Sequence, residues 1–169
     1  MTSQTEFQSR TDSDRRTKPS FLVTTFASAL FSGYSPLASG TVGSLVALAF
    51  YWIPGFELPP VSLSIVLVIF VLGIPASTSM EKYYGHDPAE VTIDEVVGMW
   101  ISLIFLPKNI FIAGAAFLLF RIFDILKPFP ARRFDTMSGG IGIMMDDVVA
   151  ALYTNCVLRL FLLLLEAFR

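Results

Sequence analysis

The chain has 169 residues, of which 54% are hydrophobic and 15% are charged, and its formal net charge is −2. Soluble domains usually contain about 25% charged residues, so this composition is typical of a multi-pass membrane protein or of a very apolar helical bundle. We find no interleaved aromatic and basic residues that would indicate a nucleic-acid partner, and the single cysteine, Cys156, excludes a disulfide or a cysteine zinc site.

The N-terminal segment, residues 1–19, is polar, and we expect it to be a disordered tail before one helical domain over residues 20–169. Basic residues directly before the first apolar run place this end in the cytoplasm by the positive-inside tendency. The run itself, residues 21–31, is shorter than the roughly 20 residues that a perpendicular span needs. It therefore predicts a short re-entrant or interfacial helix.

The remaining apolar runs predict an all-α, multi-helix bundle that passes the membrane several times. Helices are expected over residues 41–53, 61–80, 91–106 and 110–127, and a last helix from near Asp146 to the C-terminus. No alternating pattern indicates strands. Several runs are short for a full span, so re-entrant pieces or a compact bundle partly sunk in lipid are alternatives.

The charges are distributed unequally between the two sides of this predicted bundle. With the N-terminus inside, the outer connections carry only Glu57 and Lys108, and nearly every other charge lies on the cytoplasmic side. We therefore expect the functional face to be cytoplasmic.

Charged residues gather at one end of the predicted hairpin formed by residues 91–106 and 110–127. Asp94 and Glu95 precede its turn by about as many residues as Arg121 follows it. At ~1.5 Å per residue, both sets lie at the same height on neighbouring helices. Asp124 and Lys127 share a helix face with Arg121. The hairpin thus predicts a mixed cluster of acids and cations at the membrane edge.

The following segment adds to this cluster. Asp146 and Asp147 open the last predicted helix at the same end, and Arg132 and Arg133 lie on the connection that leads to it. Carboxylate clusters of this kind bind hard cations such as Mg²⁺, with water and phosphate oxygens as further ligands. We interpret the convergence as a site for a cation and a phosphate group.

Each feature also has a structural interpretation. Residues 92–95 fit a capping box, and Asp146 fits a helix N-cap. Arg121 and Asp124 could form a simple intrahelical ion pair. The basic residues before the last helix could bind anionic headgroups. His86, in a polar loop, is interpreted as a solvated residue.

The small-residue stretch at residues 35–45 leads into a predicted helix that starts at Thr41. Backbone N–H groups at a helix N-terminus attract phosphate, which makes Thr41 a candidate phosphate-binding residue. No lysine follows the glycines, so the stretch is not a P-loop. Gly40 and Gly43 could equally permit close helix packing.

Four stretches between residues 33 and 150 together resemble the phosphatidylglycerophosphatase A family, in the order that the family shows. They read GYSPLASGTVGSL, IDEVVGMWISL, FRIFDILKPFPARRFD and GGIGIMMDDVVA. The family commonly has proline where this chain has Ser39. The resemblance implies an all-helical, Mg²⁺-dependent phosphatase of the bacterial inner membrane. It would convert phosphatidylglycerophosphate, a membrane lipid, to phosphatidylglycerol.

The chemistry of the residues then suggests a role for each. Arg121 and Lys127 would neutralise phosphoryl oxygens, with Asp94 beside the metal. Attack by metal-activated water and an aspartyl-phosphate route are both open. Phosphate or headgroup binding is expected of Thr41, Arg132 and Arg133. One or two Mg²⁺ ions would be held by Glu95, Asp124, Asp146 and Asp147.

Two other classes of protein are compatible with parts of this pattern. A small transporter or channel would need charged residues at mid-membrane depth in several helices, whereas here they lie at helix ends. A non-enzymatic lipid-binding subunit would explain the basic residues but would leave the converging acids without a role. We therefore favour the phosphatase.

Overall fold

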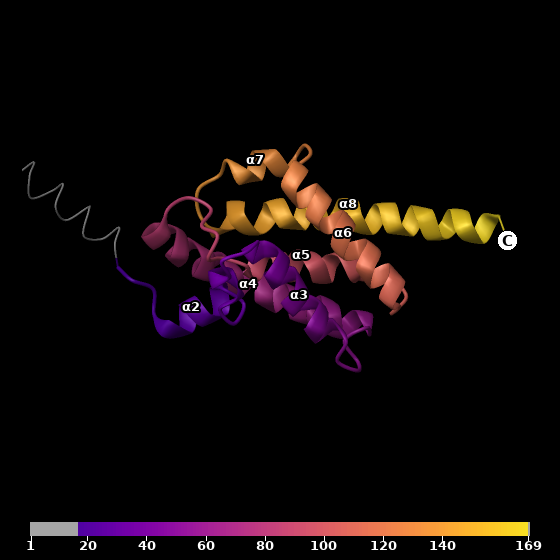
Figure 1. The fold of residues 1–169 in the computed structure, drawn as a ribbon, viewed down its shortest axis with the longest axis horizontal. Helices are drawn as coiled ribbons and strands as arrows, with labels where there is room; N and C mark the ends of the chain where they lie inside the picture. The colour runs from indigo at the N-terminus through magenta and orange to yellow at the C-terminus, as the bar shows by residue number, and fades with distance from the viewer. Residues whose placement is uncertain (1–16, 169) are drawn as a thin grey trace, which may run out of the picture.

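The computed structural model describes residues 17–168, and over these residues the chain is all-helical, as predicted (Figure 1). Of the predicted polar tail, residues 1–16 lie outside the described part. The elements are α2 (Phe21–Ala27), a short 3-10 helix (Ser32–Tyr34), α3 (Ser39–Tyr51), α4 (Pro59–Tyr84), α5 (Ile93–Leu103), α6 (Ile110–Leu126), α7 (Ala131–Asp135) and α8 (Gly140–Ala167).

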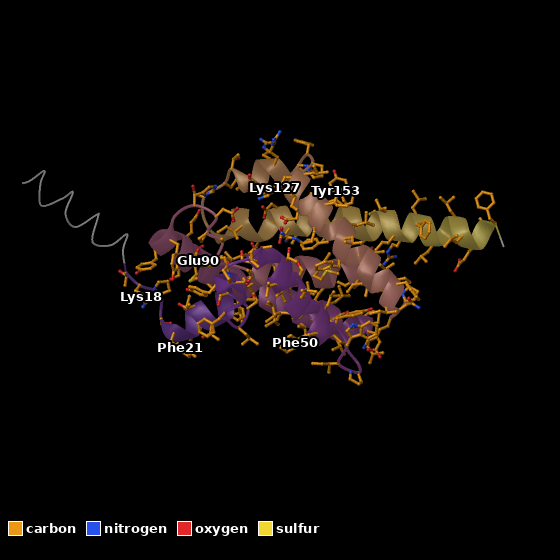
Figure 2. All side chains as sticks on the ribbon, in the orientation of Figure 1. Lys18, Phe21, Phe50, Glu90, Lys127 and Tyr153 are labelled. Atoms are coloured by element: carbon orange, nitrogen blue, oxygen red, sulfur yellow. The ribbon has the colours of Figure 1, made fainter. Side chains whose placement is uncertain are left out.

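Two helices, α4 and α8, are long and apolar enough to cross a membrane. They have 26 and 28 residues, and their most apolar windows have mean hydropathies of 2.3 and 2.1. The C-terminal turns of α8 extend beyond the other helices (Figures 1 and 2), and most of their large apolar side chains are exposed. The exposed large residues there are Leu160, Phe161, Leu163, Leu164, Leu165 and Phe168. Such a surface fits contact with lipid better than contact with water.

The centre of the bundle is α5, which packs against α3, α4, α6 and α8. Most of its residues are buried, although it has only 11 residues and is too short to span a bilayer. Its last carbonyl groups have no partner within the helix. Asn155 on α8 donates to the carbonyl oxygens of Ile101, Ser102 and Ile104 at 3.3, 3.1 and 2.9 Å, and Arg159 donates to that of Ile104 at 3.1 Å. Because α8 satisfies these groups, α5 can end inside an apolar bundle.

The predicted outer connections meet at the far end of the bundle. Lys108 Nζ donates to Glu57 Oε2 at 2.7 Å and to the backbone oxygen of Ile53 at 3.0 Å. The same ammonium group lies over the ring of Tyr51, 5.4 Å from its centroid. These contacts tie the α3–α4 connection to the α5–α6 turn.

The predicted start of the last helix was wrong, because α8 begins six residues before Asp146, at Gly140. Gly139 has a φ of 93°, which favours glycine. A Cβ on Gly140 would overlap the backbone carbonyl of Ile74, so glycine is needed for α8 to approach α4 this closely. Asp146 therefore lies inside the helix and is not its N-cap.

The interpretation of residues 92–95 as a capping box was also wrong. Thr92 is the residue before α5, but its hydroxyl makes no cap hydrogen bond. It lies 2.9 Å from the hydroxyl of Ser32 instead. A contact between distant segments has replaced the local one.

The first predicted helix, residues 21–31, is shorter in the structure, because α2 ends at Ala27. Left-handed backbone conformations follow at Ala29, Leu30 and Phe31, with φ of 42°, 60° and 67°. Three such residues in succession cannot continue a right-handed helix. The five-residue helix α7 was not predicted.

Candidate active site

Three carboxylates from two helices form a compact group, which we call the acid trio: Asp94 and Glu95 of α5 and Asp147 of α8. One oxygen of each lies within 4.8 Å of the others. Asp94 and Asp147 are 7% and 3% exposed. Gly98 helps to bring the two helices together, since a Cβ there would lie only 3.2 Å from the backbone oxygen of Asp147.

The acid trio contains oxygens that no group in residues 17–168 satisfies. Asp94 Oδ1, Glu95 Oε2 and Asp147 Oδ2 are buried and have no hydrogen-bond partner there. Burying charged groups without a partner is expensive, and three carboxylates of like charge add repulsion. A divalent cation with a preference for oxygen ligands, such as Mg²⁺, would compensate both costs. The donor set therefore fits a metal ion.

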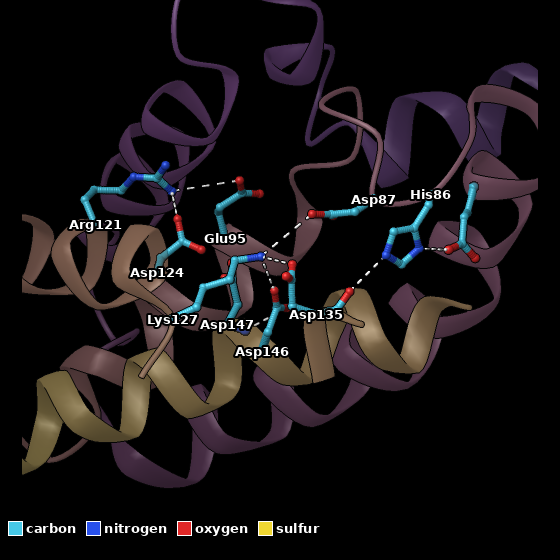
Figure 3. A network of polar contacts seen from close by, with 10 residues as sticks. His86, Asp87, Glu95, Arg121, Asp124, Lys127, Asp135, Asp146 and Asp147 are labelled. Carbon is cyan, nitrogen blue, oxygen red and sulfur yellow. Dashed lines mark hydrogen bonds and ion pairs between the residues drawn. The ribbon is translucent and has the colours of Figure 1, made fainter. Parts of the chain in front are cut away.

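Arg121 of α6 lies directly beside the acid trio (Figure 3). Its Nη1 is 3.0 Å from Asp124 Oδ2 and 3.9 Å from Glu95 Oε1. Its Nε is buried and has no hydrogen-bond partner among the described residues. Asp124 thus forms an ion pair with one end of the guanidinium group, while Nε is available to donate to an anion.

The first turn of α3 closes the site on the other side. The helix begins at Ser39, two residues before the predicted start at Thr41, and Thr41 is partly buried in that turn. The first N–H groups of a helix have no partner within it. Gly40 lies so close to the site that a Cβ would overlap the Glu95 carboxylate and approach the Arg121 guanidinium nitrogens to 2.8 and 2.9 Å.

Replacing Gly40 with alanine is therefore expected to lower kcat of the reaction at this site by roughly 100-fold, the effect of a displacement of about 1 Å in an active site. The added methyl group must displace Glu95, Arg121 or both. Gly114→Ala is the matched control, because a Cβ at Gly114 meets nothing within 4 Å. Wild-type kcat in Gly40→Ala would show that this packing does not position the site.

A second charged group surrounds Lys127, which follows the last residue of α6. Its Nζ bonds to Asp135, lies 2.8 Å from Asp146 Oδ2 and is 3.8 Å from Asp87 Oδ2 (Figure 3). Burial lowers the pKa of Lys127, but the hydrogen bonds to Asp135 and Asp146 outweigh it, so the pKa lies above that of an ordinary lysine. Lys127 is therefore a permanent cation. We call Lys127 and these three carboxylates the lysine cluster.

The structure separates the two adjacent aspartates of α8. Asp147 belongs to the acid trio, whereas Asp146 contacts Lys127. Neighbouring helical residues point about 100° apart, so one helix can serve both groups. Of the other predicted ligands, Glu95 lies in the acid trio and Asp124 pairs with Arg121.

The arginines of α7 stand apart from both groups. Arg132 and Arg133 are exposed and form no ion pair with any residue of the described part. Figure 2 shows the neighbouring Lys127 at the same end of the bundle. Their position fits contact with headgroups better than contact with the acid trio.

The sequence interpretation missed two acids of the lysine cluster, Asp87 and Asp135. Asp135 ends the stretch FRIFDILKPFPARRFD, and Asp87 follows His86 in the polar connection before α5. Both acids lie close to other charged residues in the sequence, and this was the only local indication that they could belong to the charged cluster. Nothing local showed that both would meet Lys127.

Comparisons with known proteins identify the family of the chain. The family described as Phosphatidylglycerophosphatase A matches residues 25–162. A protein of that name from Escherichia coli (strain K12) is 40% identical over 131 residues, which are 75% of this chain and 76% of the relative. Another from Haemophilus influenzae is 51% identical over 70 residues, 40% of this chain and 43% of the relative.

A further relative has a different name. A Bacteroides thetaiotaomicron protein, provisionally named a phosphatidylinositol-3-phosphatase, is 40% identical over 146 residues, 81% of this chain and 91% of the relative. No solved structure is significantly similar to this chain.

Proposed function

The chain belongs to the phosphatidylglycerophosphatase A family, and from this premise we propose that the acid trio and Arg121 form the site at which it hydrolyses phosphatidylglycerophosphate. The products are phosphatidylglycerol and inorganic phosphate. The observation that carries the proposal is the convergence of unpartnered, buried carboxylate oxygens from α5 and α8 beside an arginine with a free donor. Such an arrangement can hold a cation and a phosphate group together.

We propose Mg²⁺ as the cation, with Asp94, Glu95 and Asp147 as its protein ligands, since all donors are carboxylate oxygens. When bound, the ion would supply Lewis-acid polarisation of the phosphoryl group and neutralise its charge.

The protein groups around the acid trio bind and orient the phosphate. Arg121 Nε is free to donate to a phosphoryl oxygen, while Asp124 holds the guanidinium group in place. The first turn of α3, with Gly40 and Thr41, directs backbone N–H groups toward the same anion. These donors stabilise the charge that develops on the phosphoryl oxygens during transfer.

Asp124 and Asp146 act in this proposal through the cations that they contact. Asp124 orients Arg121, and Asp146 holds Lys127 beside the turn of α8 that also carries Asp147. Lys127 adds positive charge near the phosphate site, and Arg132 and Arg133 bind the lipid headgroup region.

The lipid environment explains the location of the site. Long stretches of α4 and α8 are apolar, and the lysine cluster joins α7 to the turn of α8 that also carries Asp147 (Figure 3). We propose that the end of the bundle with the lysine cluster faces the cytoplasm of a bacterial inner membrane. The acyl chains then stay in the bilayer while the terminal phosphate reaches the acid trio.

The test is phosphate release by the purified full-length protein in lipid nanodiscs that contain Mg²⁺. We expect kcat/KM for phosphatidylglycerophosphate to exceed that for phosphatidylinositol 3-phosphate by at least about tenfold. A phosphate on a flexible glycerol can enter the site between α3 and α6. A phosphate on the inositol ring would bring the bulky ring into the same space. An equal or higher kcat/KM for phosphatidylinositol 3-phosphate would contradict the proposal that phosphatidylglycerophosphate is the preferred substrate.

A further inference from the structure

His86 joins three segments that surround the proposed site. Its Nδ1 lies 2.9 Å from Glu81 Oε1 at the end of α4, and its Nε2 lies 2.9 Å from the backbone oxygen of Asp135 in α7 (Figure 3). The other oxygen of Glu81 accepts from the N–H of Gly139, directly before α8, at 2.6 Å. We call these contacts the histidine clasp.

Both partners of the imidazole are hydrogen-bond acceptors. A carboxylate and a backbone carbonyl can only accept, so both ring nitrogens must donate to complete the clasp. Neutral imidazole has one N–H, whereas the imidazolium ion has two. The clasp is therefore complete only when His86 is protonated.

The charged groups around His86 favour the protonated form. The hydrogen bond that His86 donates to Glu81 is the largest cause that raises the pKa of His86. The Asp135 carbonyl and Asp87 act in the same direction, while burial opposes them. Lys127, directly after α6, carries a positive charge that is balanced by the carboxylates of Asp87, Asp135 and Asp146.

The clasp leads directly to the lysine cluster. Asp87 follows His86 in the chain, and the backbone carbonyl that His86 binds belongs to Asp135. The carboxylates of both aspartates face Lys127. Two of the three acids around Lys127 are thus held in place by the clasp, while the third, Asp146, precedes Asp147 of the acid trio.

We propose that protonated His86 is a positioning residue, which holds the lysine cluster against the acid trio and makes turnover depend on its own protonation. The inference rests on the phosphatase activity proposed above for the same site. His86 touches neither the acid trio nor Arg121 in the structure, so it acts through Asp87, Asp135 and Lys127.

The direction of the pH dependence follows from the sign of the shift. The pKa of His86 in the folded protein lies above the ordinary histidine value of about 6.5. The clasp is therefore fully formed below that value and is lost as the pH rises through the folded pKa.

The first measurement does not depend on activity. His86 is the single histidine of the chain, so NMR of the full-length protein, purified without a polyhistidine tag, reports its titration alone. We expect the pKa to lie above about 6.5 and to fall toward that value in Glu81→Gln. A wild-type pKa at or below that value would overturn the inference.

The second measurement compares kcat of wild type and His86→Ala from about pH 6 upward. We expect a loss of about tenfold at the acid end, the size typical of residues that support an active site indirectly. The ratio of wild-type kcat to His86→Ala kcat should fall as the pH rises, because the wild type then loses its histidine clasp too. His86→Gln can donate only through its amide nitrogen, so its kcat should lie between the two.

Lys108→Gln is the matched control, since it breaks an ion pair at the opposite end of the bundle. The ratio of wild-type kcat to Lys108→Gln kcat should not vary with pH. A pH-independent ratio for His86→Ala would overturn the positioning role alone. Absence of phosphatase activity in the wild type would overturn the proposed function and this inference with it.

Discussion

Replacing Asp147 with asparagine is expected to lower kcat by roughly three orders of magnitude, equivalent to about 4 kcal/mol of transition-state stabilisation. Asparagine keeps the size of the side chain but removes a charge that a hard cation needs. Metal ions typically supply several kcal/mol in such reactions. The measurement is phosphate release from phosphatidylglycerophosphate at saturating substrate. If Asp147→Asn kept half of the wild-type kcat, Asp147 would not be part of the proposed site.

The same variant should be more stable than wild type when no metal is present. Asp147 is 3% exposed and has an unpartnered oxygen close to two other carboxylates, so removing its charge relieves repulsion and a desolvation cost. Thermal unfolding in the presence of chelator should show a higher midpoint. Glu57→Gln, at the far end of the bundle, is the control for loss of an acid. A lower midpoint for Asp147→Asn would indicate a structural role instead.

Removal of divalent metal is expected to abolish phosphate release, and added Mg²⁺ should restore it. Without a cation, the acid trio would repel the phosphate that Arg121 attracts. Binding should also stabilise the fold, by about 2.7 kcal/mol when the free ion is at 100 times its Kd. The thermal midpoint of the wild type should therefore rise with Mg²⁺.

Asp147→Asn should lose most of that rise in midpoint, while Glu57→Gln should keep it, which separates binding at the acid trio from general effects of Mg²⁺. Phosphate release that survives exhaustive chelation would contradict the proposal. So would an equal Mg²⁺-dependent rise in wild type and Asp147→Asn.

Much of the fold could be predicted because it depends on local properties of the chain. Long apolar runs bounded by glycine, proline and polar residues can satisfy their backbone only as helices in an apolar environment. This reasoning predicted an all-α bundle and the helices around residues 41–53, 61–80 and 110–127. Helical spacing also placed Arg121 and Asp124 on one face at the height of Glu95, where they lie in the structure.

The sequence by itself therefore determined the fold class, the approximate positions of most helices and the end of the bundle at which the site charges gather. Only the tertiary structure decided which charges meet. Gly140 allows α8 to approach α4 closely, and the packing of α8 against its neighbours directs Asp147 to the acid trio and Asp146 to Lys127. Hydropathy and periodicity describe neighbours along the chain, whereas helix packing brings together residues that are distant in it.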